Sequence, residues 1–152
     1  MPRIEAIRRI KAAHPGAFFL FSNGLTAREA AHFADGPENF YLLHAMGEAL
    51  SVGIGLALAR PELTVVVVDG DGNALMGLAA WSMMPVANLR YYVLANGVYE
   101  TTGGQPLPKL PWRPPWCTVV PVAPDPRPTP NPPAPKATWA RAKAWLGEHG
   151  NP

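Results

Sequence analysis

The sequence has little of several features that would assign it to a class at once. It contains one cysteine, Cys117, which excludes an internal disulfide framework and favours a reducing, cytoplasmic setting. We interpret Cys117 as a small buried hydrophobic side chain. Only 16% of the 152 residues are charged and the formal net charge is +2. No basic stripe is interleaved with aromatic residues, so we expect no nucleic-acid partner.

Long apolar runs are also missing. Residues 1–11 carry five charged side chains and no apolar run of the signal-peptide type. The most apolar stretch, residues 50–68, is interrupted by Arg60, Pro61 and Glu62. It therefore predicts a buried helix followed by a buried strand, and no membrane span.

The first hundred residues alternate short apolar runs with helical patterns. The runs at 17–21, 39–43, 63–68 and 89–95 predict strands. A helix that ends near residue 14 is predicted before the first run. The segments between the runs predict helices over 26–35, 48–59 and 74–84. Four consecutive valines in the third run suit a central parallel strand covered on both faces. We therefore predict an α/β fold, a doubly wound, mostly parallel sheet with helices on both faces.

Two local patterns add detail to these helices. Thr26 and Glu29 have the spacing of a capping box, so Thr26 is expected to cap the second helix. Gly53 and Gly55 are expected to let the third helix pack closely against a neighbour.

The composition changes after residue 105. Thirteen of the nineteen prolines lie between Pro106 and Pro135, which favours extended, irregular chain. Residues 117–122 are still able to form an edge strand. A final helix is expected over 136–149, with Trp139, Ala142, Trp145 and Leu146 on one face. We thus expect an α/β core over 1–105, a proline-rich extended segment over 106–135, and a C-terminal helix and tail over 136–152.

Polar residues follow the predicted strands, at the carboxyl ends where such sheets bind ligands. The strongest group is Gly70-Asp71-Gly72-Asn73 after the valine run, with Asn96 after the next strand. Glycines let the backbone approach an anion, and a helix N-terminus offers free N–H groups. Oxygens of Asp71, of Asn96 and of a backbone carbonyl near Val98, with two diphosphate oxygens and a water, would make an octahedral Mg²⁺ shell.

Two simpler interpretations compete for the Gly-Asp-Gly group. Asp69, Asp71 and Asn73 match the start of an EF-hand loop. That loop needs Gly at its sixth position and Glu at its twelfth, where Ala74 and Ala80 stand. An ordinary strand-to-helix turn also uses Gly, Asp and Asn for its geometry. The additional presence of Asn96 favours the metal site over both.

Gly-Asp-Gly followed by a distant Asn resembles the signature of thiamine diphosphate-dependent enzymes. The resemblance is to their C-terminal, diphosphate-binding domain, and in particular to the beta subunit of sulfopyruvate and phosphonopyruvate decarboxylases. Further segments similar to that family are Asn39-Phe40-Tyr41, His44 to Gly47, Leu56 to Pro61, Tyr99 to Gln105, and Asn23 to Glu29.

The resemblance implies thiamine diphosphate and Mg²⁺ as cofactors. It implies Asp71, Asn96 and the Val98 carbonyl as metal ligands. Met46 would lie under the cofactor and hold it bent. The other residues that the resemblance places at the cofactor are Asn23, Gly24, Thr26, His44, Ala45, Gly47, Gly70, Gly72, Asn73 and Tyr99.

The resemblance also implies a partner. Enzymes of this kind need a glutamate that protonates the aminopyrimidine, and it lies on a separate pyrimidine-binding domain. The chain has no room for a second domain of that size, so we expect a partner alpha subunit and a hetero-oligomer. The implied function is decarboxylation of a small anionic 2-oxo acid, active only with that partner.

Three alternatives stay open. One is another reaction of the same cofactor, such as carboligation of the acetolactate synthase type or oxidative transfer. Another is a non-catalytic or regulatory subunit, because His44-Ala45 stands where the family has Gly-Ser, and Asn73 and Ala95 also depart from its pattern. The last is a flavodoxin-type phosphate- or nucleotide-binding domain.

Overall fold

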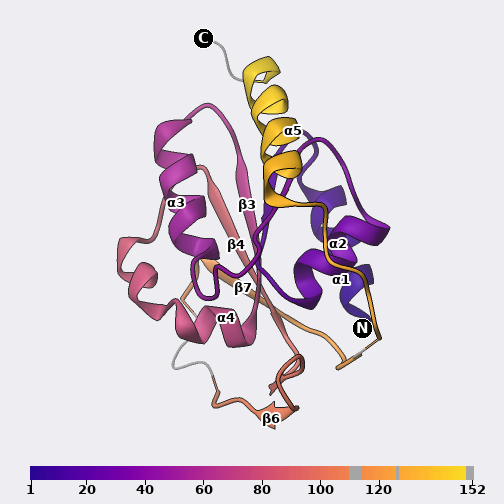
Figure 1. The fold of residues 1–152 in the computed structure, drawn as a ribbon. Coiled ribbons are helices and arrows are strands. Elements are labelled where there is room, and N and C mark those ends of the chain that lie inside the picture. Colours follow the sequence, from indigo (N-terminus) through magenta and orange to yellow (C-terminus); the bar gives the residue numbers. More distant parts are fainter. Residues whose placement is uncertain (110–113, 126, 150–152) are drawn as a thin grey trace.

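A five-stranded parallel sheet forms the centre of the computed structural model, which describes residues 1–109, 114–125 and 127–149 (Figure 1). The strand order is β2 (Asn39–Tyr41), β1 (Phe18–Phe21), β3 (Val65–Gly70), β4 (Leu89–Ala95) and β7 (Cys117–Pro121), and each neighbouring pair is parallel. The valines of β3 are fully buried in the middle of the sheet. The predicted fold class, the central valine strand and the edge strand are all confirmed.

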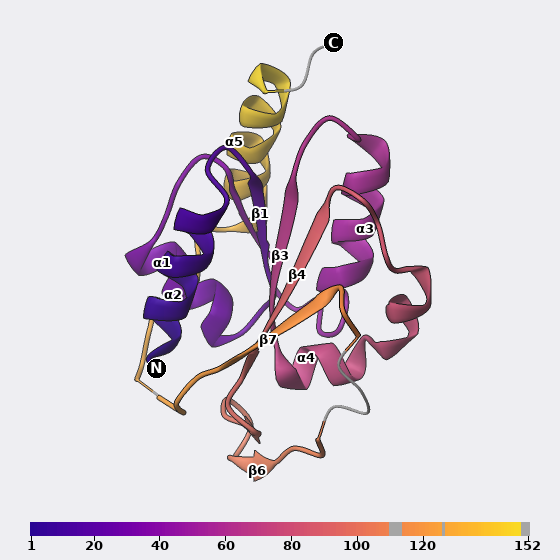
Figure 2. The ribbon, with the colours of Figure 1, turned by 180° about the vertical axis from the view of Figure 1, so that it is seen from behind.

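Helices cover both faces of this sheet (Figure 2). One face carries α1 (Arg3–Ala13) and α2 (Leu25–Phe33), and the other carries α3 (Ala49–Ala59) and α4 (Asp71–Met76). Because side chains alternate along a strand, Val66 and Val68 pack toward α1 and α2, whereas Val65 and Val67 pack toward α3. Each strand therefore contributes to two apolar layers.

The C-terminal part of the chain returns to the core. Helix α5 (Pro135–Glu148) buries Ala142, Trp145 and Leu146 against Phe18. Trp139 is 51% exposed and meets Phe40 in a T-shaped ring contact, so the expected apolar face of α5 is buried at three of its four residues. No described helix is long and apolar enough to cross a membrane.

The proline-rich segment is described only in part. Residues 110–113 and 126, and residues 150–152 of the tail, lie outside the described residues. Two short strands, β5 (Val98–Tyr99) and β6 (Gln105–Pro106), pair as an antiparallel ribbon below β4. Cys117 of β7 is buried, as expected. The three-part division of the chain stays a prediction, and β7 shows that the proline-rich part contributes to the core sheet.

The helix expected over 74–84 is wrong in extent. Helix α4 begins already at Asp71 and ends at Met76, and a 3₁₀ helix, η1, follows from Leu78 to Met83. Gly77 lies between them, where an added Cβ would stand 2.3 Å from the carbonyl oxygen of Gly47. The loop that carries Gly47 thus passes directly against the break between the two helices.

The capping box expected at Thr26 is also wrong. The N-cap of α2 is Gly24, with a φ of 84°, and no side chain caps this end of the helix. Thr26 is the second residue of the helix, because the chain enters α2 through the left-handed conformation of Gly24. Glu29 is engaged elsewhere, in a buried ion pair with Arg3 of α1.

Gly53 and Gly55 lie two residues apart in α3 but have different surroundings. An added Cβ at Gly53 would stand 2.2 Å from Cγ2 of Val67, whereas at Gly55 it would meet no atom within 4 Å. Close packing is therefore confirmed for Gly53 and wrong for Gly55, which is exposed.

This contrast predicts opposite effects of the same substitution. We expect Gly53→Ala to lower the free energy of unfolding by about 1–3 kcal/mol, because Val67 is stiff and fully buried. We expect Gly55→Ala to raise it by about 0.5–1 kcal/mol through helix propensity alone. Urea denaturation of both variants tests this, and a stabilising Gly53→Ala would contradict the packing described.

Candidate functional site

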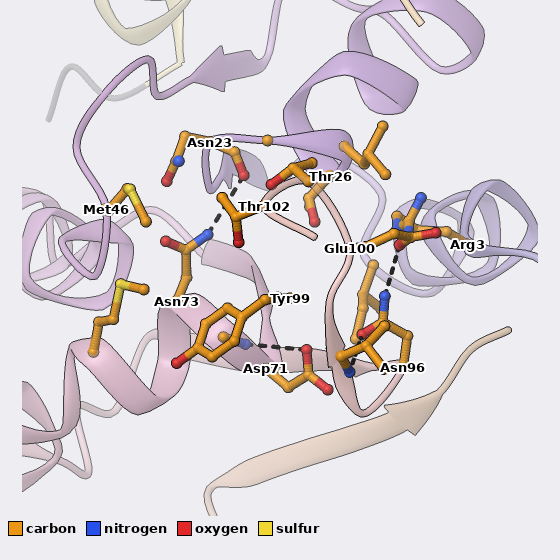
Figure 3. Close-up of a pocket in the computed structure, with 18 residues that line it drawn as sticks. Arg3, Asn23, Thr26, Met46, Asp71, Asn73, Asn96, Tyr99, Glu100 and Thr102 are labelled. Atoms are coloured by element: carbon orange, nitrogen blue, oxygen red, sulfur yellow. Dashed lines mark hydrogen bonds and ion pairs between the residues drawn. The ribbon is translucent and has the colours of Figure 1, made fainter. Parts of the chain in front are cut away.

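A pocket opens where β1, β3 and β4 end (Figure 3). The loop after β1 supplies Asn23 and Gly24, the β3–α4 junction supplies Gly70 to Asn73, and the loop after β4 supplies Asn96. The predicted residues that line the pocket are Asn23, Gly24, Thr26, Met46, Gly70, Asp71, Gly72, Asn73, Asn96, Val98 and Tyr99. His44, Ala45 and Gly47 lie in the adjoining loop and are not among the lining residues.

Asp71 is the buried carboxylate of the pocket and the first residue of α4. Its Oδ1 accepts a hydrogen bond from the Gly72 N–H at 3.0 Å, and its Oδ2 accepts one from the Gly97 N–H at 2.7 Å. Burial raises the pKa of Asp71, and the Gly97 and Gly72 N–H groups oppose this rise. The carboxylate is thus held in one orientation, beside the loop that carries Asn96.

Asn96 faces two partners of different kinds. Its Oδ1 accepts a hydrogen bond from the Val98 N–H at 3.1 Å, and its Nδ2 donates one to Oε2 of Glu100 at 2.6 Å. Val98 begins β5, so the pairing of β5 with β6 shapes this tight loop. Through the Gly97 N–H, the loop is bonded to Asp71. The three predicted metal ligands therefore belong to one connected unit.

Asn73, on helix α4, is bonded to two loops of the pocket. Its Oδ1 accepts a hydrogen bond from the Gly47 N–H at 3.1 Å, and its Nδ2 donates one to the Asn23 carbonyl at 3.4 Å. The loops after β1 and β2 are in this way attached to α4. The departure from the family pattern at Asn73 has a structural use that the sequence did not reveal.

The remaining walls combine close backbone approach with exposed apolar surface. Gly72 lies against Tyr99, where an added Cβ would stand 2.9 Å from Cε1 of the ring. Met46 and Met76 present half-exposed side chains to the pocket. His44 adopts a left-handed conformation with a φ of 62° in the exposed turn before Met46. The pocket thus offers a polar end at Asp71 and an apolar side at the methionines.

The residues present fit a magnesium ion and a polar ligand. The carboxylate of Asp71, the amide of Asn96 and the Val98 carbonyl are the hard oxygen donors that Mg²⁺ prefers. The side-chain Oδ1 of Asn23 is buried without a hydrogen-bond partner, so the amide of Asn23 still has hydrogen-bonding capacity for a ligand. No group of three or more His, Cys, Asp or Glu side chains that could hold a metal occurs among the described residues.

Several lining residues were missed from the sequence: Arg3, Leu25, Met76, Leu94, Glu100, Thr101 and Thr102. Glu100 to Thr102 lie within the family-like segment from Tyr99 to Gln105, which was the available signal. The sequence contains no signal for Arg3, because only the packing of α1 against α2 brings this residue to the pocket.

The chain is similar to a family model and to several curated proteins. A family model described as "Thiamine pyrophosphate enzyme, C-terminal TPP binding domain" matches residues 22–126. The chain is 43% identical over 107 residues to phosphonopyruvate decarboxylase of Streptomyces hygroscopicus, across 68% of this chain and 26% of that protein. It is 42% identical over 108 residues to sulfopyruvate decarboxylase subunit beta of Methanothermobacter thermautotrophicus, across 69% of this chain and 58% of that protein.

A more distant relative has a different reaction in its name. The chain is 39% identical over 77 residues to subunit beta of 2-oxoacid:ferredoxin oxidoreductase 2 of Aeropyrum pernix, across 48% of this chain and 24% of that protein. In each of these three comparisons the chain spans less than two thirds of the length of the curated relative.

Proposed function

We propose a function on the premise that the chain belongs to the thiamine pyrophosphate enzymes and carries their C-terminal TPP-binding domain. The proposed function is that of the diphosphate- and Mg²⁺-binding subunit of a 2-oxo acid decarboxylase. One observation carries the proposal. Asp71 and Asn96, from the ends of two adjacent strands, are joined through the Gly97 N–H and lie with Val98 at one pocket. The decarboxylase relatives support the class of reaction.

Each part of the pocket has a task in this proposal. Asp71, Asn96 and the Val98 carbonyl would hold Mg²⁺, and Gly70, Gly72, Asn73, Asn23, Gly24 and Thr26 would surround the diphosphate. Met46 would support the cofactor from below, with His44, Ala45 and Gly47 on the pyrimidine side and Tyr99 behind Gly72. Thiamine diphosphate, when bound, supplies the electron sink for decarboxylation. The chain positions the cofactor and provides an apolar wall that excludes water.

A separate pyrimidine-binding alpha subunit belongs to the same proposal. Among the described lining residues only Asp71 and Glu100 carry carboxylates. Asp71 is assigned to the metal and Glu100 is paired with Arg3, so neither is available to protonate the aminopyrimidine. A relative named as a beta subunit supports assembly with another chain. A small anionic 2-oxo acid as substrate and a cytoplasmic location complete the proposal.

Two alternative functions are each supported by a specific observation. Another reaction of the cofactor, carboligation or oxidative transfer, is favoured by the similarity to a 2-oxoacid:ferredoxin oxidoreductase subunit. A non-catalytic or regulatory subunit is favoured by His44-Ala45, Asn73 and Ala95, which depart from the family pattern. A flavodoxin-type domain is excluded, because the chain belongs to a different family.

Reconstitution tests the proposal. The chain is mixed with a pyrimidine-binding subunit, thiamine diphosphate and Mg²⁺, and carbon dioxide release from sulfopyruvate, phosphonopyruvate and pyruvate is measured. We expect release only when both subunits and both cofactors are present. Acetolactate formed from pyruvate, or reduced ferredoxin in a parallel mixture to which oxidised ferredoxin is added as electron acceptor, would favour the first alternative. Cofactor binding without turnover of any of these acids would favour the regulatory subunit.

A further inference from the structure

Three buried charged side chains, Arg3, Glu29 and Glu100, form a network at one side of the pocket, and the proposed function gives them no task. Arg3 of α1 is 4% exposed and pairs through Nη1 with Glu29 of α2. Its Nη2 pairs with Glu100, beside Asn96 (Figure 3). The side chains of Glu29 and Glu100 are 3% and 8% exposed. Buried ion pairs contribute little net stability to a fold, because the loss of hydration of the charged groups offsets their attraction. Their place beside Asn96 therefore indicates another role.

Glu100 is the point where this network meets the pocket. Its Oε2 accepts hydrogen bonds from Nη2 of Arg3 and from Nδ2 of Asn96, the latter at 2.6 Å, and its Oε1 accepts one from the Asp125 N–H. Three donors from three parts of the chain thus converge on one carboxylate. An ionised carboxylate only accepts, so every group that faces it must donate.

This requirement fixes the orientation of the Asn96 amide. With Nδ2 toward Glu100, Oδ1 lies on the other side, where it also accepts the Val98 N–H. A flipped amide would place Oδ1 against the Glu100 carboxylate and Nδ2 against the Val98 N–H. Both contacts would then join like groups, an acceptor with an acceptor and a donor with a donor. The two hydrogen bonds therefore select one of the two amide orientations.

The Glu100 carboxylate is itself held by groups from two other parts of the chain. Arg3 lies on α1 and is shared with Glu29 of α2, so two packed helices set its position. The Asp125 N–H holds the second oxygen of Glu100 from the chain that follows β7. Glu100 thus has a position that does not depend on a bound ligand.

We propose that Glu100, held by Arg3, is a positioning residue that presents the Asn96 oxygen to Mg²⁺ before the ion arrives. The inference rests on the proposed function, because it takes Asn96 as a ligand. Removal of a hydrogen-bond partner that orients a metal ligand typically lowers metal affinity by about 10- to 100-fold. The network thereby connects α1 and α2 to the metal site.

The test compares Glu100→Ala with Glu29→Gln, since both remove a carboxylate partner of Arg3 and only the first touches Asn96. Mg²⁺ is titrated by calorimetry into the full chain with its partner subunit and thiamine diphosphate, and the melting temperature is recorded in parallel. We expect Glu100→Ala to weaken Mg²⁺ binding by about 10- to 100-fold. We expect Glu29→Gln to lower the melting temperature and leave Mg²⁺ affinity unchanged.

A pair of further variants separates orientation from general loosening. Asn96→Asp places a carboxylate against that of Glu100. Asn96→Asp combined with Glu100→Gln places an amide N–H₂ opposite the new carboxylate and gives up the hydrogen bond from Nη2 of Arg3. We expect the double variant to recover Mg²⁺ affinity relative to Asn96→Asp alone. A purely structural role of Glu100 predicts that the double variant binds no better, and this comparison decides the matter if Glu100→Ala does not fold.

The outcomes are distinguishable. A wild-type protein that binds no Mg²⁺ with thiamine diphosphate overturns the proposed function and this inference together. Normal wild-type binding with unchanged affinity in Glu100→Ala overturns this inference alone. Equal losses of affinity in Glu100→Ala and Glu29→Gln also overturn it, because they would indicate that any damage to the network suffices.

Discussion

Replacing Asp71 with alanine is expected to abolish Mg²⁺-dependent binding of thiamine diphosphate. The substitution removes the one charged ligand proposed for the metal, so we expect a loss of more than about 100-fold, the upper range for changes to groups that merely orient ligands. Isothermal titration calorimetry with Mg²⁺, and again with excess EDTA, measures the loss. Asp71→Asn keeps the shape and removes the charge, so it should bind more weakly than wild type.

Glu62→Ala is the control for this experiment. It also removes a carboxylate, but Glu62 lies in the turn before β3, at the end of that strand opposite to the pocket. We expect its affinity for thiamine diphosphate to match that of wild type. Because the Gly72 and Gly97 N–H groups lose their acceptor in Asp71→Ala, circular dichroism must show that the fold persists. Unchanged Mg²⁺-dependent affinity in a folded Asp71→Ala protein would show that Asp71 is not a ligand.

The second large effect concerns Asp69, which lies on β3 inside the sheet. It is 1% exposed, its Oδ1 accepts the Gly70 N–H at 2.9 Å, and its Oδ2 accepts the Tyr91 hydroxyl at 2.9 Å. Burial raises the pKa of Asp69 from 3.8 to about 6, although these hydrogen bonds oppose the rise. The folded protein therefore holds the proton of Asp69 more tightly than the unfolded chain does.

Stability should accordingly fall as the pH rises through this interval. The contribution of Asp69 is complete below the unfolded pKa of 3.8 and is lost by about pH 6. A shift of this size corresponds to about 3 kcal/mol. We expect Asp69→Asn to remove this pH dependence. The variant should be more stable than wild type at pH 7, because it buries a neutral amide where wild type buries a charged carboxylate. Urea denaturation between pH 4 and pH 7 measures both effects.

Asp35 offers a control of opposite sign. Burial raises its pKa, but hydrogen bonds from Arg141 and Tyr41 outweigh burial and lower the pKa overall. Its contribution to stability is therefore present at neutral pH and is lost as the pH falls through the lowered pKa. Asp35→Asn should remove a loss of stability on acidification, in contrast to Asp69→Asn. The same slope in wild type and Asp69→Asn would rule out the assigned role of Asp69.

The fold could be predicted where the pattern is local and repeats. Strand β4 has the predicted bounds, and the valines of β3 marked the centre of the sheet because burial on both faces demands an unbroken apolar run. The errors arose where a distant segment decides the outcome. The helix that begins at Asp71 ends beside Gly77, where the Gly47 carbonyl lies against the chain, and nothing in the local sequence reports that contact.

The same division applies to the site. Gly-Asp-Gly and Asn96 stood out because both follow apolar runs, and carboxyl ends of neighbouring parallel strands meet at one edge. Arg3 could not be found in this way, because its surroundings in the sequence predict only a helix that ends near residue 14. Its role depends on the packing of α1 and on the buried carboxylates of Glu29 and Glu100.

The most direct measurement is the location of the metal in crystals of the chain with its partner subunit, thiamine diphosphate and Mn²⁺, which stands in for Mg²⁺ and scatters anomalously. We expect one anomalous peak bonded to a carboxylate oxygen of Asp71, to Oδ1 of Asn96 and to the Val98 carbonyl, with the diphosphate beside Gly72 and Asn73. A bound cofactor whose metal lies away from Asp71 and Asn96 would contradict the proposed site.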